Sequence, residues 1–77
     1  MEVNVPMLKK TIVNKNTTLE AVAHNLGIDR STLYRKLKNG SSGITLSDAQ
    51  RISRYLDLAP EESLLIFWGN TNFNVLH

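Results

Sequence analysis

The segment between residues 17 and 38 constrains the fold of this chain more than any other feature. It reads TTLEAVAHNLGIDRSTLYRKLK, and its apolar residues recur at helical spacing in two short runs. Only Gly27, Ile28 and Asp29 separate these runs, and glycine readily adopts the left-handed conformation that ends a helix. The segment therefore predicts two short helices joined by a tight turn.

The first predicted helix, about nine residues long, has clear start and packing signals. Thr17 and Glu20 have the spacing of a capping box, while Thr18 is an equally good N-cap. Ala23 lies four residues before Gly27, where crossing helices leave room only for a small side chain. The residues expected to face inward are Leu19, Val22, Ala23 and Leu26.

The second predicted helix begins after Asp29, whose carboxylate can accept hydrogen bonds from the first free N–H groups. Leu33 and Leu37 lie one turn apart and define the buried direction, and Ile28 joins them from the turn. The opposite face then carries Ser31, Tyr34, Arg35 and Lys38.

Three further segments predict helices, which gives an all-α domain of five short helices. Pro6 opens the earliest segment at its N1 position. Thr45 and Asp48 offer a cap with an acidic first turn, and Pro60 opens the last helix just before two glutamates. The residues expected to face inward are Leu8 and Ile12, with Thr11 or Val13, and then Leu46, Ala49, Ile52 and Leu56.

The two ends of the chain carry a different pattern. EVNV at 2–5 and NFNV at 72–75 alternate apolar and polar residues, as half-buried strands do. Such short β segments can pair with each other or with a second chain, and equally they can be frayed ends. We therefore treat 1–77 as a single domain, with 1–5 and 69–77 as extended or frayed segments.

Composition limits the class of protein. The chain has 77 residues, no cysteine, no leader-like pattern and no apolar run near the length of a membrane span. We expect a soluble protein of the bacterial cytosol, associated with the nucleoid. Residues 9–40 hold seven Lys and Arg against two acidic residues, whereas residues 41–77 hold two against four. One surface is therefore expected to face a polyanion.

Residues 18–38 have the spacing of a helix-turn-helix, whose second helix enters the major groove of DNA. An outer face bearing Arg and Lys is by itself typical of a solvated helix, but the preceding helix and turn favour DNA contact. Arginine can bond guanine O6 and N7 as a fork, and a tyrosine ring can lie against a thymine methyl group or a sugar. The expected base-reading residues are Arg30, Ser31, Tyr34 and Arg35, and the expected phosphate contacts are Thr17, Thr18, Thr32, Lys36, Lys38, Asn39 and Ser41.

The stretch from residue 7 to residue 68 resembles the small Cro/C1 (lambda-repressor-like, Xre) family of helix-turn-helix regulators, especially the short phage-type versions. The resemblance implies a dimeric repressor that binds a palindromic double-stranded operator through the four reading residues. The matching positions are Ala23-x3-Gly27-Ile28, Arg30-Ser31-Thr32-Leu33, the fourth-helix core Ala49, Ile52 and Leu56, and the ending Pro60-Glu61-Glu62 with Ile66-Phe67.

Some positions depart from this family. Leu19 stands where it usually has a glutamine that helps to hold DNA, and Ala59 replaces the usual hydroxyl cap of the last helix. GIDRSTLYRKLK alone also resembles the Fis-type motif of activators, but there the chain normally ends soon after that helix. Because members of the Cro/C1 family also act as antitoxins or regulate partners, the alternative function is a protein-interaction module, such as an antitoxin or antirepressor, with weak DNA binding.

The run LLIFW at residues 64–68 covers every side of a helix with large apolar side chains, more than one core can bury. Either the tail folds over the outer side, or these residues form a homodimer interface that places two recognition helices one DNA turn apart. The interface candidates are Leu64, Leu65, Trp68, Phe73 and Val75.

We expect no enzyme activity, cofactor, metal or small-molecule substrate, and no membrane partner. His24 and His77 have no positioned carboxylate or nucleophile near them in the sequence. The carboxylates pair only as helix caps, so the sequence offers no catalytic group.

Overall fold

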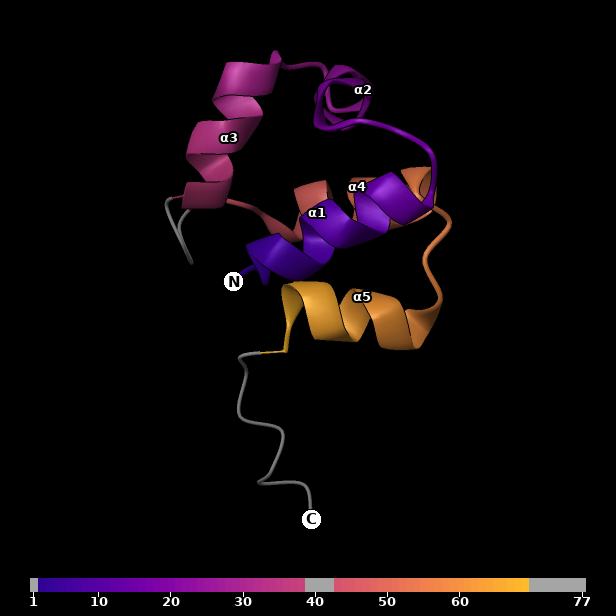
Figure 1. Cartoon of the computed structure of the whole chain (residues 1–77). Helices are drawn as coiled ribbons and strands as arrows, with labels where there is room; N and C mark the ends of the chain where they lie inside the picture. The colour runs from indigo at the N-terminus through magenta and orange to yellow at the C-terminus, as the bar shows by residue number, and fades with distance from the viewer. Residues whose placement is uncertain (1, 39–42, 70–77) are drawn as a thin grey trace.

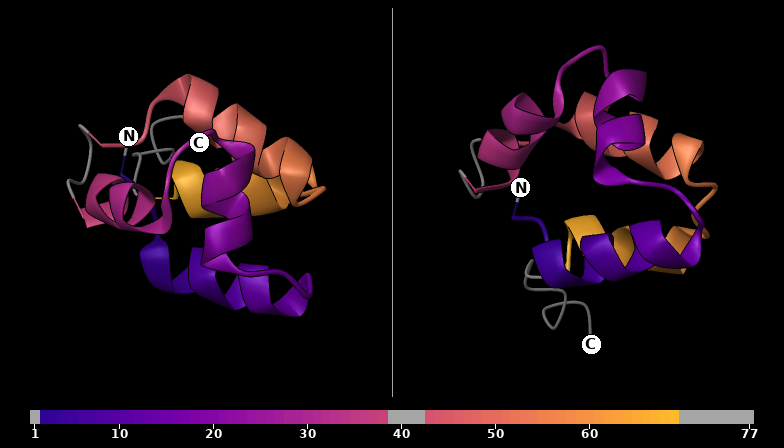
Figure 2. Two further views of the ribbon diagram at one scale, coloured as in Figure 1. Left: turned by 90° about the horizontal axis from the view of Figure 1, so that it is seen from above. Right: turned by 45° about the horizontal axis from the view of Figure 1, so that its top comes forward.

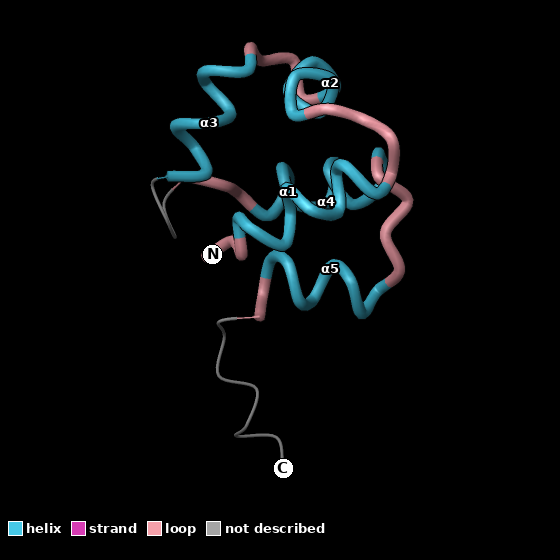
Figure 3. The backbone as a smooth tube through the Cα atoms, in the orientation of Figure 1, coloured by secondary structure: helices cyan, strands magenta, loops and turns pink. Residues whose placement is uncertain are grey.

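The computed structural model of the protein describes residues 2–38 and 43–69. Within these ranges the chain forms helices and loops and no strand (Figure 3). The all-α fold of five short helices predicted from the sequence is confirmed. The helices are α1 (Val5–Asn14), α2 (Leu19–Asn25), α3 (Arg30–Lys38), α4 (Leu46–Tyr55) and α5 (Pro60–Phe67).

The helices pack in two groups that α4 joins (Figure 1). α2 and α3 contact each other at one end of the molecule, and α1 contacts α5 at the other end. α4 contacts both α2 and α5, and the right-hand view of Figure 2 again places α2 and α3 on the side opposite α5. None of the described helices is long and apolar enough to cross a membrane.

One apolar core holds the helices together. Ala23 is buried, as predicted for the point where α2 and α3 cross. Burying one large aliphatic or aromatic side chain stabilises the folded chain by about 1.5–3 kcal/mol. Every helix contributes to this core, and its largest fully buried side chains are Leu8, Val22, Leu33, Ile52, Ile66 and Phe67.

The structure shows which of two threonines, Thr17 or Thr18, caps the start of α2. Thr18 is the N-cap, because its Oγ1 accepts a hydrogen bond from the Ala21 backbone N–H at 3.1 Å. Thr17 therefore lies one residue outside the helix, and Glu20 occupies the first turn without the predicted capping box. α2 is seven residues long, shorter than the helix predicted from the sequence.

The other helix starts follow the sequence closely. Pro6 is the second residue of α1 rather than the first. Thr45 and Asp48 form the predicted capping box of α4. Ala59 offers no side-chain cap to α5, but the Glu62 carboxylate accepts the Ala59 backbone N–H at 2.8 Å and satisfies that donor.

Three helices end in the same hydrogen-bonded turn, in which the residue after the cap has a positive φ. At the end of α2, Gly27 has φ 77°, and the Ile28 N–H donates to the Ala23 carbonyl at 3.1 Å. These features define a Schellman motif. Asn16 and Asp57 take the equivalent place after α1 and α4, with φ 60° and 54°. Asn and Asp tolerate this conformation better than other non-glycine residues.

Of the two alternatives that the sequence left open for residues 2–5, the β segment is not formed. Asn4 caps α1 with its side chain, and its backbone N–H donates to the Ile66 carbonyl at 2.7 Å. Val3 is buried in the core, so the apolar and polar alternation reflects one anchored residue before a helix. The segment 72–75 lies outside the described residues.

Two residues expected to face inward are exposed instead. Leu46 is 56% exposed because it is the first residue of α4, before the helix reaches the core. Val13 is 70% exposed, whereas its alternative Thr11 is half-buried and donates its hydroxyl to the Met7 carbonyl at 2.8 Å. Helix periodicity therefore predicts the buried residues correctly at the centre of each apolar helix face, and incorrectly at these two positions on its edge.

Candidate nucleic-acid interface

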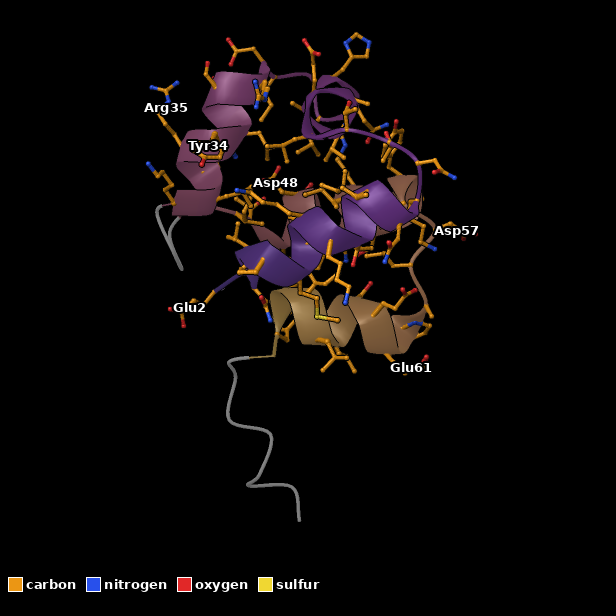
Figure 4. The ribbon with its side chains drawn as sticks, viewed as in Figure 1. Glu2, Tyr34, Arg35, Asp48, Asp57 and Glu61 are labelled. Atoms are coloured by element: carbon orange, nitrogen blue, oxygen red, sulfur yellow. The ribbon has the colours of Figure 1, made fainter. Side chains whose placement is uncertain are left out.

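The turn between α2 and α3 leaves α3 with one buried face and one exposed face. Leu33 and Leu37 are buried, and Ile28 packs against the core from the turn. Figure 4 shows Tyr34 and Arg35 on this helix, with Arg35 reaching away from the other helices. The residues predicted to read bases are all exposed: Arg30, Ser31, Tyr34 and Arg35.

A hydrogen-bond network at the start of α3 orders one of these residues. Asp29 Oδ1 accepts the Thr32 backbone N–H at 2.8 Å and the Ser31 hydroxyl at 3.0 Å. The Thr32 side chain, the Thr32 N–H and the Ser31 hydroxyl, in that order, lower the pKa of Asp29. An ionised carboxylate only accepts hydrogen bonds, so Ser31 must donate its proton and keeps its oxygen lone pairs for a ligand.

Arg35 is held loosely by its own helix. Its Nη2 donates to the Thr32 hydroxyl at 3.3 Å, which leaves most of the guanidinium donors available. Thr32 is half-buried and lies between Asp29 and Arg35. Its hydroxyl therefore already has contacts within the protein, in addition to the phosphate contact predicted from the sequence.

The loop before α2 brings hydroxyl groups together at a helix N-terminus. Thr18 is exposed and uses its oxygen as the cap, so its hydroxyl proton remains available for an anion. Thr17 lies 3.3 Å from the Tyr55 hydroxyl, measured between oxygen atoms. Tyr55 comes from α4 and was not anticipated from the sequence, because nothing local relates it to Thr17.

A concave surface opens between α1, the start of α2 and α3. It includes the two threonines before α2 and all four predicted readers. It also includes Lys9 and Val13 of α1, a helix to which the sequence assigned no site residue. Lys9 Nζ lies 5.1 Å from the centroid of the Tyr34 ring. Helix periodicity alone could not indicate this contact, because it depends on how α1 packs relative to α3.

Lys36 differs from Lys38, the other lysine predicted to bind phosphate. Its Nζ lies 2.8 Å from Asp48 Oδ2, and both side chains are partly buried. Burial raises the pKa of Asp48, but hydrogen bonds from Lys36 and from the Thr45 backbone and hydroxyl outweigh it, so the pKa is lowered overall. Lys36 thus joins α3 to α4, and this internal ion pair disfavours the predicted phosphate role.

The backbone of Lys36 is also packed closely. A Cβ placed on Gly43 would lie 1.8 Å from the Lys36 carbonyl oxygen, so only glycine allows this approach. The end of α3 is therefore set by the segment that leads into α4. Lys38 is exposed, as predicted, while Asn39 and Ser41 lie outside the described residues.

Three of the five candidates for a dimer interface lie in the described part of the chain. Leu64 and Leu65 are 49% and 54% exposed on α5, and Trp68 is half-buried with its ring against Phe67. Phe73 and Val75 lie outside the described residues.

α3 itself carries no acidic side chain among Arg30–Lys38, and the Asp29 carboxylate caps its start. The labelled carboxylates of Asp57 and Glu61 lie across the molecule from Tyr34 and Arg35. His24 is exposed, and the described residues contain no group of three potential metal ligands. These two carboxylates of the acidic half of the sequence are thus distant from the exposed face of α3, whereas Asp48 of the same half pairs with Lys36.

A short helix, a tight turn and a second helix with an exposed cationic face define a helix-turn-helix DNA-binding domain. Residues 7–67 match the model of the Cro/C1-type HTH DNA-binding domain, and the chain belongs to that family. The match confirms the resemblance seen in the sequence. Comparisons with curated proteins and with solved structures gave no significant match.

Proposed function

We propose that this protein is a transcriptional repressor of the phage or prophage type that binds a palindromic operator as a homodimer. It works in the bacterial cytosol at the nucleoid, by binding alone, without catalysis, cofactor or small-molecule substrate. α3 enters the major groove, and the N-terminus of α2 rests on the phosphate backbone. The observation that carries this proposal is the exposure of all four residues predicted to read bases, on the side of α3 away from Leu33 and Leu37.

The chemistry of these residues indicates which base edges they prefer. Arg30 and Arg35 each offer guanine a pair of donors to O6 and N7. Ser31 donates to Asp29 and therefore accepts from a base, which favours the exocyclic amine of cytosine or adenine. Exposure of these groups supports a preference for operators that contain guanine together with cytosine or adenine.

Leu64 and Leu65 support the homodimer. A chain of this size gains DNA affinity by placing two α3 helices on half-sites one turn apart. Two exposed leucines on adjacent positions of α5 offer the apolar surface that such an interface needs. The same leucines favour the second candidate function, a protein-interaction module such as an antitoxin or antirepressor.

Selection of bound duplexes from a random DNA pool tests the proposal. We expect an enriched palindromic sequence whose half-sites lie about one helical turn apart. Electrophoretic shifts with that duplex at two salt concentrations should show affinity falling steeply as salt rises. No enrichment, or binding that salt does not weaken, would contradict a DNA-binding repressor and favour the protein-interaction module.

A further inference from the structure

Two lysines on different helices converge on the ring of Tyr34. Lys9 Nζ of α1 lies 5.1 Å from the ring centroid, and Lys38 Nζ of α3 lies 5.3 Å from it. An ammonium group within about 6 Å of an aromatic centroid is attracted by the ring quadrupole. The ring therefore brings two positive charges into one small region of the surface.

No carboxylate neutralises this pair within the described ranges. The ion pair found there joins Lys36 to Asp48 instead. Glu20 and Asp29 line the same concave surface, but neither forms an ion pair with Lys9 or Lys38 in the described part of the chain. Asp29 instead accepts hydrogen bonds from its own helix. Two cations held close together repel each other, and an anion placed between them removes that cost.

The location of the pair indicates which anion it binds. Lys9 and Tyr34 line the concave surface together with Thr18 and Arg35, which the proposed function places against DNA. A DNA strand that follows α3 therefore passes the Tyr34 ring. The phosphate diester is the anion that this strand carries at every nucleotide.

We infer that Lys9, Lys38 and Tyr34 form a binding site for one phosphate of the DNA backbone, and this inference rests on the proposed function. The two ammonium groups neutralise the phosphate, and the ring positions them. The base-reading role that the sequence predicts for Tyr34 is thereby revised to a positioning role, and α1 is added to the DNA interface.

The test uses the full chain and a fluorescein-labelled duplex of mixed sequence, about 20 base pairs long, which spans roughly two turns of B-DNA. Fluorescence anisotropy at several sodium chloride concentrations gives the slope of log affinity against log salt, which counts the neutralised phosphates. Lys9→Gln is compared with Lys10→Gln, which removes the same charge from the next exposed residue of α1, outside the described lining of the concave surface. Circular dichroism confirms that each variant folds.

We expect Lys9→Gln to weaken binding roughly threefold to tenfold at about 0.1 M salt and to lower the slope by up to about 1. Lys10→Gln should change both quantities much less. Lys38→Gln should act like Lys9→Gln, and the double variant should lose little more slope than either single variant, because one phosphate is shared.

Tyr34 variants separate positioning from reading. Tyr34→Phe keeps the ring, so we expect the wild-type slope and an unchanged base preference. Tyr34→Leu should lower the slope in the wild-type background and have no further effect on it in the Lys9→Gln, Lys38→Gln double variant.

Each remaining outcome is decisive. Equal losses for Lys9→Gln and Lys10→Gln would overturn the phosphate site and leave DNA binding by α3 intact. Additive slope changes for the two lysines would mean separate phosphates and would also overturn it. A wild-type chain that binds no duplex at any salt concentration would overturn the proposed function itself.

Discussion

α3 and α5 are alike on their inner faces and opposite on their outer faces. Each buries two large apolar side chains in the same core, namely Leu33 and Leu37 of α3 and Ile66 with Phe67 of α5. The outer face of α3 is cationic and polar, whereas α5 exposes Leu64 and Leu65. The comparison teaches that the inner face places a helix in the fold, while the outer face decides which partner it can bind.

The largest effect should come from the inner faces, where the two helices are equivalent. Leu33→Ala and Ile66→Ala each remove a fully buried side chain, and each should lower the free energy of unfolding by about 3 kcal/mol. Urea denaturation followed by circular dichroism measures this loss. Arg35→Ala and Leu65→Ser serve as outer-face controls and should unfold near the wild-type midpoint. A midpoint shift in either control as large as that of Leu33→Ala would contradict the prediction that only the inner faces stabilise the fold.

The next effect concerns the outer face of α3. Arg35→Ala should reduce discrimination between the selected operator and a scrambled duplex by about 2 kcal/mol, because a bidentate contact to guanine is lost. Competition binding at fixed salt measures this ratio. The matched control is Arg54→Ala, which removes an exposed arginine from α4 and should leave the preference unchanged. An unchanged ratio in Arg35→Ala would show that Arg35 does not read a base.

A smaller effect is expected on the outer face of α5. Leu65→Ser should weaken self-association by about 1.5 kcal/mol, roughly tenfold in the dimer dissociation constant, because an apolar contact is lost. Sedimentation equilibrium with and without operator DNA measures it. The control is Leu46→Ser, which changes an exposed leucine at the start of α4, outside both the interface candidates and the described lining of the concave surface. Equal self-association in Leu65→Ser and the wild type would remove α5 from the interface.

The smallest effect concerns the ion pair that fastens α3 to α4. The folded-state pKa of Asp48 lies below its ordinary value of 3.8, so ionised Asp48 stabilises the protein above that pH. This contribution is lost as the pH falls through the lowered pKa. Asp48→Asn should therefore cost less than about 1 kcal/mol near neutral pH, because the pair is partly screened.

Urea denaturation at neutral and at strongly acidic pH measures this prediction. The difference between Asp48→Asn and the wild type should shrink as the pH is lowered. Asp57→Asn removes a carboxylate at the other end of α4 and serves as the control. A difference that stays constant with pH would mean that the ion pair does not carry the effect.

Much of the site could be predicted from the sequence because its signals are local. Gly27 marks the turn, Asp29 the cap of α3, and Leu33 with Leu37 the buried direction, and the structure confirms each of these. The positive φ of Asn16 was missed, because asparagine indicates a left-handed turn less strongly than glycine does.

Other features could not be predicted, because they depend on contacts between helices. Lys36 and Lys38 are equivalent in sequence as cationic residues of one helix, yet only Lys36 faces Asp48. Lys9 lies far from Tyr34 in the sequence and beside it in space. Short-range periodicity carries no information about either neighbour.

The sequence by itself determined the five helices, the turn between α2 and α3, and the family to which the chain belongs. These depend on caps, turn residues and apolar spacing within a few positions of each other. Only the tertiary structure decided which lysines face solvent, that α1 lines the candidate DNA surface, and that residues 2–4 anchor α1 rather than form a strand. The reason is physical, since the packing of one helix on another selects the neighbours of each charge and each N–H group.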